Sequence, residues 1–259
     1  MTPDSVRKLI LKVDIVAMVI LGAVIQGAGI SFFVLSPLNR PAEAPPLRPV
    51  VEAYLDDVAT GDAAGALAMT QVDDRTFDGE STGLLVDEAL RGARERITDP
   101  QVEAVDEHSF AGSTARATVV YRLAGEQHEA KLTWRHNEDT NEWRVVDGLI
   151  RTLIVEGLPG HTVPFQLAGV TPEPKEVCHG EGDEAWCGPA SAYAVFAGVY
   201  ELRADLSGFE VHPHNTTAAE QLVTIMPGAL SRVSYLAVPR GEPWPIVNGK
   251  SIDPSPDEG

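Results

Sequence analysis

One segment of this sequence limits the possible folds more than any other, because it is apolar for the full thickness of a membrane. Ile15–Leu35 contains 21 residues without a formal charge. A helix that rises about 1.5 Å per residue would carry this segment across roughly 30 Å of hydrocarbon. The hydrophobic part of a cleaved signal peptide is shorter, and the nearest small-x-small triplet, Ala42-Glu43-Ala44, lies well beyond the run. The sequence therefore predicts a retained transmembrane helix.

The residues before this segment predict its orientation. Three basic side chains precede the apolar run, at Arg7, Lys8 and Lys12, and positive charges favour the cytoplasmic side of a membrane. We therefore expect residues 1–14 in the cytoplasm, a single pass through the cell membrane at residues 15–35, and every later residue in an extracytoplasmic position.

Small residues recur along one face of the predicted membrane helix. Ala23, Gly27 and Ser31 lie four positions apart, which is a spacing that lets two membrane helices pack closely. This face is a candidate contact for a helix-mediated homodimer. The alternative is that it reflects only how common small residues are in membrane helices.

The charge of the chain argues against one class of partner. Lys and Arg total 20 and Asp and Glu total 38, which gives a formal net charge of -18. Proteins that bind nucleic acids need positive surface to neutralise phosphates. The acidic composition therefore predicts no nucleic-acid partner.

Prolines separate the predicted membrane helix from the first folded domain. Residues 36–48 are rich in proline, which favours an extended spacer. The apolar residues that follow have helical spacing until Gly61-Asp62 ends the pattern. These residues are Val51, Tyr54, Leu55 and Val58. Two further helices are predicted at Ala63–Met69 and Leu84–Ile97, and Asp99-Pro100 ends the second of them.

The period of the apolar residues then changes to two, which predicts β-strands. The first strand runs from Ala115 to Leu123 and turns at Gly125, and a second strand follows. Its apolar residues are Ala130, Leu132 and Trp134. A third strand is predicted at Trp143–Val146. Helices followed by antiparallel strands predict an α+β domain, with the sheet curved around the helices.

Two stretches of this domain resemble a known family. The helical VEAYLDDVATGDAAGALAM and the strand ending NEWRVVDG resemble the nuclear-transport-factor-2-like superfamily, in particular extracytoplasmic domains of actinobacterial membrane proteins and lipoproteins. The resemblance implies a cone-like domain over residues 49–155 that can bind small molecules, and some members are enzymes that use Asp, His or Tyr. The residues of these types are His108, Tyr121, His128 and Asp147. None matches a catalytic pattern, so no catalytic residue is predicted.

Residues 156–245 predict a second, β-rich domain. Short alternating segments occur at Thr162–Ala168, Val195–Leu202, Leu222–Ile225 and Val233–Val238, which favours a small antiparallel β-sandwich. The segment VFAGVYEL is similar to a Pro-Gly-x-Tyr strand of bacterial cell-surface β domains, with Ala197 in place of the proline. Residues 246–259 are expected to form a disordered tail.

The two cysteines of the chain lie within this second region. Cys178 and Cys187 are separated by eight residues. In an oxidising compartment this spacing suits a disulfide that closes a small loop and contributes roughly 2–3 kcal/mol. The alternative is a pair of free thiols.

One of these cysteines also suggests an enzyme. Cys187-Gly188-Pro189-Ala190-Ser191 looks like the start of papain-like cysteine peptidases that trim bacteriocin leaders, which would make Cys187 a nucleophile at the start of a helix. However, Glu181 stands where that family has a glutamine, and only 72 residues follow Cys187. A Cys178–Cys187 disulfide would also block the thiol, so the peptidase is the less favoured alternative.

Candidate metal ligands are sparse. His212 and His214 are separated by a proline, which favours a loop rather than a metal site. The acidic residues Glu181, Asp183 and Glu184 are predicted to form a solvated loop rather than a Ca²⁺ site, because Ca²⁺ needs about six to eight oxygen ligands. We therefore predict no metal and no cofactor.

These observations together predict a non-enzymatic, single-pass, membrane-anchored protein of binding or structural type. Its extracytoplasmic domains would contact a protein, a cell-wall component or a small ligand. The alternative function is a small-molecule or enzymatic pocket inside the cone-like domain.

Overall fold

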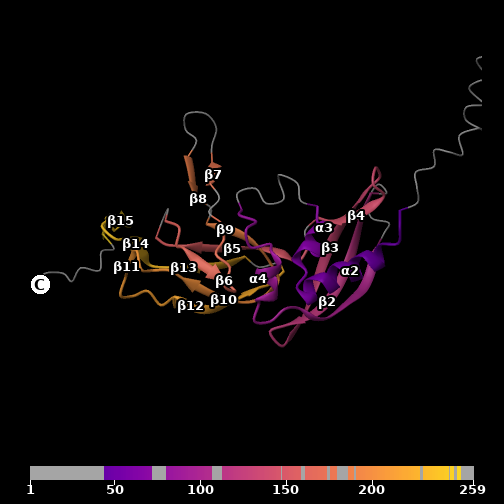
Figure 1. The fold of residues 1–259 in the computed structure, drawn as a ribbon, viewed down its shortest axis with the longest axis horizontal. Helices are drawn as coiled ribbons and strands as arrows, with labels where there is room; N and C mark the ends of the chain where they lie inside the picture. The colour runs from indigo at the N-terminus through magenta and orange to yellow at the C-terminus, as the bar shows by residue number, and fades with distance from the viewer. Residues whose placement is uncertain are drawn as a thin grey trace, which may run out of the picture. The chain divides into compact units, whose positions relative to one another are not determined.

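The computed structural model describes residues 44–71, 80–106, 113–146, 148–158, 161–173, 176–179, 186–189, 191–227, 230–244, 246–247 and 250–251. The chain forms two compact units, and all elements below belong to the second, Pro45–Gly259. Figure 1 shows that this unit consists of several small sheets with few helices.

The fold class predicted from the sequence is wrong. Strands make up 47% of the structure and helices only 15%, so the unit is mainly β rather than α+β. The transmembrane helix of the predicted fold is not found either, because no helix within the described ranges is both long and apolar enough to cross a membrane. The predicted segment Ile15–Leu35 lies outside the described residues, as do Ala23, Gly27 and Ser31.

The first helix follows the predicted apolar pattern. Helix α2 spans Leu47–Thr60 and buries five side chains. These are Leu47, Val51, Tyr54, Leu55 and Val58, which include the four predicted ones. The helix ends at Gly61, whose φ of 90° places it in the left-handed region that favours glycine. Helix α3, Ala63–Ala68, begins directly after it, where the Asp62 carboxylate accepts a hydrogen bond from the Gly65 N–H (2.8 Å).

Four antiparallel strands form the sheet beside α2 (Figure 1). They are β1 (Thr98–Asp106), β2 (Thr114–Leu123), β3 (Glu126–Asn137) and β4 (Glu142–Val145), paired in that order. The predicted alternation on β2 and β3 is confirmed, because each predicted apolar residue from Ala115 to Trp134 is buried. Trp134 packs edge-on against Tyr54 of α2, with ring centroids 5.8 Å apart.

The helix predicted at Leu84–Ile97 is largely wrong. Only α4, Asp87–Arg91, is helical. The chain beyond α4 pairs with a distant strand instead, because the Arg94 and Glu95 N–H groups donate to Val199 O (2.7 and 3.3 Å). The strand β1 was not predicted at all. It contains Pro100, which an edge strand tolerates because its unbonded side needs no N–H donor.

A three-stranded sheet connects the two regions that the sequence separated. Its central strand is β5, Ile150–Glu156. Strand β9, Ala192–Phe196, pairs with it antiparallel, and β13, Ser231–Ser234, pairs with it parallel. The predicted boundary at residue 155 therefore falls inside a strand, and the prediction of a purely antiparallel sandwich is wrong.

Other short strands complete the unit. The chain forms β6 (Phe165–Leu167), β10 (Gly198–Ala204) and β12 (Glu220–Ile225) in one sheet, β11 (Phe209–Val211) with β14 (Ala237–Pro239), β7 (Glu176–His179) with β8 (Trp186–Pro189), and β15 (Ile246–Val247) with β16 (Lys250–Ser251). One apolar core joins β5, β6, β9 and β10. Its largest members include Phe165, Tyr193, Tyr200 and Tyr235, together with Leu84, which precedes α4.

Candidate functional site

Of the residues that the sequence singled out for a pocket in the first domain, the structure describes only Tyr121 and His128. His108 and Asp147 lie outside the described residues. Tyr121 is fully buried, its ring lies 5.8 Å from that of His128, and burial raises its pKa to about 12. Neither Tyr121 nor His128 lines the groove beside β4 or the pocket beside β11. Tyr121 and Trp134 are both fully buried in the sheet beside α2.

The two histidines considered as metal ligands, His212 and His214, follow strand β11. His214 donates its backbone N–H to Nδ1 of His212 (3.0 Å), and the His212 ring packs edge-on against Trp244. A nearby pocket is lined by five residues of the β11 region. These are Leu206, Phe209, Glu210, Val211 and Arg240. Among the described residues, no group of three or more His, Cys, Asp or Glu side chains could hold a metal. Glu181, Asp183 and Glu184 lie outside them.

The position of Cys187 departs from the peptidase pattern. A papain-like nucleophile would begin a helix, but Cys187 lies within strand β8. Its partner in the register of the β7–β8 pair is Cys178. The structure therefore places the two cysteines opposite each other on neighbouring strands, and it does not supply the helix that the peptidase needs.

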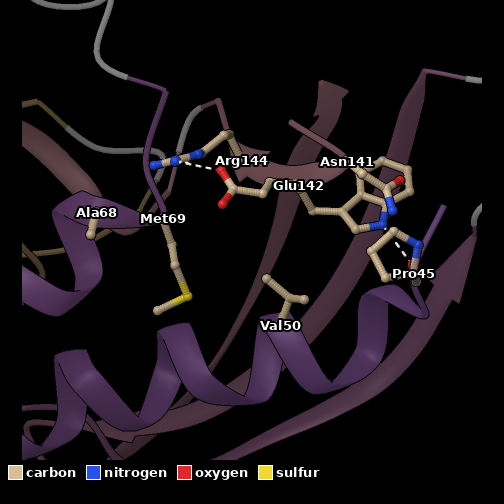
Figure 2. Close-up of a pocket in the computed structure, with 8 residues that line it drawn as sticks. Pro45, Val50, Ala68, Met69, Asn141, Glu142 and Arg144 are labelled. Carbon is tan, nitrogen blue, oxygen red and sulfur yellow. Dashed lines mark hydrogen bonds and ion pairs between the residues drawn. The ribbon is translucent and has the colours of Figure 1, made fainter. Parts of the chain in front are cut away.

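A groove lies where α2 begins, α3 ends and β4 passes (Figure 2). Its volume is about 240 Å³. The lining residues are Pro45, Val50, Ala68, Met69, Asn141, Glu142, Trp143 and Arg144. Figure 2 shows the Val50 and Met69 side chains extending into the space between the helix and β4, with Glu142 and Arg144 at its border. The groove thus combines an apolar floor with a charged border.

Three polar contacts hold the border of the groove in place. Arg144 and Glu142 form an ion pair (Nη2 to Oε2, 2.7 Å), and Arg144 lowers the pKa of the Glu142 carboxyl. The Trp143 indole N–H donates to Pro45 O (2.8 Å), which ties the start of α2 to β4. Asn141 Oδ1 lies 3.0 Å from His136 Nε2. These contacts fix the border without filling the groove.

On the side of β4 that faces away from β3, here called its outer edge, the backbone is hydrogen bonded at Val145. Alternate residues of a strand direct their backbone groups to the same side. Val145 faces away from β3, because its N–H donates to Met69 O (2.8 Å) and its C=O accepts from the Gln71 N–H (2.7 Å). Val146 faces β3, where its N–H donates to Thr133 O (2.8 Å). The segment after α3 therefore covers the edge of β4 at Val145.

At Trp143, the same edge has no backbone partner among the residues that the structure describes. This residue stands two positions before Val145 and therefore presents its N–H and C=O on the same outer side. Trp143 stands opposite His136 of β3. The His136 N–H points away from β4, because it donates to Ser113 O (2.8 Å). The two opposite residues therefore direct their backbone groups away from each other. Within the described ranges, neither backbone group of Trp143 has a partner on this side. Trp143 is only 4% exposed, and buried backbone groups are nearly always hydrogen bonded.

Sequence reasoning missed this groove. It predicted the strand that contains Trp143 but could not place Val50 and Met69 beside it, because Val50 belongs to α2 and Met69 follows α3, both far away in the chain. The usable signal was the tryptophan itself, which stands next to an Arg and a Glu in a short strand near the surface.

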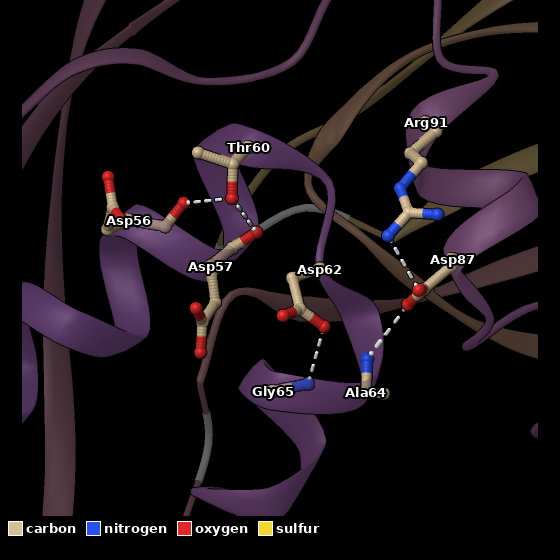
Figure 3. A network of polar contacts seen from close by, with 8 residues as sticks. All are labelled: Asp56, Asp57, Thr60, Asp62, Ala64, Gly65, Asp87 and Arg91. Atoms are coloured by element: carbon tan, nitrogen blue, oxygen red, sulfur yellow. Dashed lines mark hydrogen bonds and ion pairs between the residues drawn. The ribbon is translucent and has the colours of Figure 1, made fainter.

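A second group of polar contacts lies at the end of α2, at the start of α3 and in α4 (Figure 3). Asp87 accepts hydrogen bonds from the Ala64 N–H (3.0 Å) and from Arg91 (2.8 Å). Asp57 lies beside this network, and burial, followed by the nearby carboxylates of Asp62 and Asp56, raises its pKa. The Ala64–Asp87 hydrogen bond joins α3 to α4, and the Asp87–Arg91 contact lies within α4, so we interpret the network as structural.

The raised pKa of Asp57 predicts how one substitution changes stability with pH. Its carboxyl holds a proton more tightly in the folded state than in the unfolded state, so folding loses stability as pH rises above the ordinary value of 3.8. Asp57→Asn is therefore expected to raise the urea midpoint at neutral pH, and this gain should vanish below pH 3.8.

The contrasting control is Asp205→Asn. The Ser207 side chain and N–H lower the pKa of Asp205, so its charged form favours folding and the same substitution should lower the midpoint at neutral pH. Equal shifts for both variants at all pH values would contradict the prediction.

No family model, curated protein or solved structure matches this chain. The resemblance to the nuclear-transport-factor-2-like superfamily and the actinobacterial origin therefore stay predictions.

Proposed function

We propose that this chain is a non-enzymatic binding module that holds an extended polypeptide segment of a partner protein at the outer edge of β4. One observation carries the proposal: the backbone N–H and C=O of Trp143 face outward beside an apolar groove. A peptide strand can donate and accept hydrogen bonds at such an edge, and its side chain can enter the neighbouring pocket.

The size of the groove favours a peptide over a metabolite. Pockets for small molecules commonly enclose about 300–1,000 Å³, whereas this groove has about 240 Å³. A space of this size suits one large apolar side chain over Val50 and Met69. A single buried anchor of this kind supplies much of the affinity in many protein interfaces.

The charge of the chain adds a preference for the partner. With a formal net charge of -18, the chain attracts basic segments and repels acidic ones over several ångströms. We therefore expect a peptide with an apolar anchor and basic flanks. In line with the sequence prediction, we assign this binding to the cell envelope outside the cytoplasm, where paired cysteines are common.

The test begins with a phage-displayed library of random linear peptides selected on the immobilised full-length chain. The strongest binder is then synthesised, and its affinity is measured for the unmodified chain and for Val50→Lys. Because a lysine at Val50 places a charge on the apolar floor, we expect binding at least about 30-fold weaker.

The matched control is Leu222→Lys. Leu222 is 60% exposed on β12 and does not line the groove, so this variant should bind normally. N-methylation of the peptide at the one amide that pairs with Trp143 should abolish binding, while methylation of the next amide should not. Equal binding by both lysine variants, or the absence of any enriched peptide, would refute the proposal.

A further inference from the structure

Strands β7 and β8 form a ribbon of two strands. In the described part of the chain, each pairs only with the other, and neither joins one of the larger sheets. An isolated two-stranded ribbon is marginally stable in water. Some additional interaction must therefore hold this pair together.

The register of the ribbon supplies a candidate. Cys178 stands directly opposite Cys187, between the pairs Val177–Gly188 and His179–Trp186. Opposite residues in an antiparallel pair have Cα atoms about 4.5 or 5.5 Å apart, depending on the type of pair. Both separations lie within the range of about 4.4–6.8 Å that a disulfide requires. A shift of the register by one residue would place the cysteines on opposite faces.

We propose that Cys178 and Cys187 form an intramolecular disulfide across this ribbon and that the bond is what maintains it. These are the only two cysteines of the chain, so no other intramolecular pairing competes. The inference does not depend on the groove at β4, since the two sites share no strand.

The bond forms by thiol–disulfide exchange with an oxidant that is itself a disulfide. One cysteine thiolate attacks the oxidant and releases one of its thiols, and the second cysteine then displaces the other. The chain loses two protons and two electrons, and the oxidant becomes two thiols. Reduction by a dithiol reverses the step and is expected to open the ribbon, while the sheets around β5 and β10 persist.

Mass spectrometry tests the bond directly. The full-length chain is incubated with oxidised glutathione, unfolded without reductant and treated with iodoacetamide. We expect no added alkyl group, no glutathione adduct, and a mass lower than that of the reduced chain by two hydrogen atoms. Cleavage after Glu181 or Glu184 should leave two peptides joined to each other. Two alkylated cysteines, or a disulfide-linked dimer on a non-reducing gel, would overturn the proposal.

Hydrogen exchange tests the consequence for the ribbon. In the reduced chain and in a Cys178→Ala/Cys187→Ala variant, amides of 176–179 and 186–189 should exchange about 100-fold faster than in the oxidised chain. Amides of β5 and β9 serve as the internal control and should not change. Unchanged exchange in the ribbon after reduction would show that the disulfide does not maintain it.

Discussion

Replacing Trp134 with alanine is expected to lower the free energy of unfolding by about 3–5 kcal/mol. The side chain is fully buried at the centre of the sheet beside α2, and its ring packs edge-on against Tyr54. Alanine would leave a cavity between β3 and the helix, because a packed interior relaxes only partly. Urea denaturation followed by far-UV circular dichroism measures the loss, and an unchanged m-value would show that both end states keep their compactness.

Trp134→Phe is the matched control for this prediction. The indole Nε1 is buried and has no hydrogen-bond partner among the described residues. Phenylalanine keeps the aromatic contact and removes this unsatisfied donor, so it should cost less than half as much as alanine. Equal losses for the two variants would mean that the packing at Trp134 does not determine the stability of the sheet.

The second large effect is expected at Gly148. Its φ is +25°, and a Cβ atom there would lie 2.5 Å from the Tyr54 hydroxyl oxygen. That hydroxyl cannot move away freely, because it accepts a hydrogen bond from the buried Leu149 N–H (2.7 Å). Gly148→Ala should therefore destabilise the fold by about 2 kcal/mol or more, through the clash and the loss of this hydrogen bond.

A double-mutant cycle separates these causes. Tyr54→Phe alone should cost about 1–3 kcal/mol, because the Leu149 N–H loses its acceptor. In the double variant the clash is gone, so the combined cost should be smaller than the sum of the two by about 1 kcal/mol.

Gly125→Ala isolates the backbone contribution to the Gly148 effect. Gly125 also has a positive φ, of +80°, but a Cβ atom there would meet nothing within 4 Å. Its substitution should therefore show the backbone strain alone. Additive losses in the Gly148–Tyr54 cycle would contradict the proposed clash.

Local periodicity was enough to predict part of this fold. The face of α2 around Tyr54 and the alternation of β2 and β3 follow from the spacing of apolar residues over one or two turns, or along one strand. Gly61 likewise marks the end of α2, because few other residues adopt its backbone conformation. In each case the information lies within about fifteen neighbouring residues.

Pairing between distant segments could not be predicted in the same way. The residues from Leu84 to Ile97 have a helical pattern, but Arg94 and Glu95 form backbone hydrogen bonds with Val199, more than a hundred positions away. For the same reason, the sequence did not predict the groove, whose residues come from the start of α2, the end of α3 and β4. For Cys178 and Cys187, the spacing suggested a bond, whereas only the register could show that the two positions are opposite.

The parallel pairing of β5 with β13 has a consequence for synthesis of the chain. Leu153 of β5 lies opposite Ser231 of β13, so one backbone edge of the central strand has no partner until residues 231–234 have been made. Pairs so distant in sequence close slowly, because the intervening loop must first be ordered. On the ribosome, the unpaired backbone edge of β5 is therefore expected to stay available to other strands or to chaperones until Ser231–Ser234 emerge.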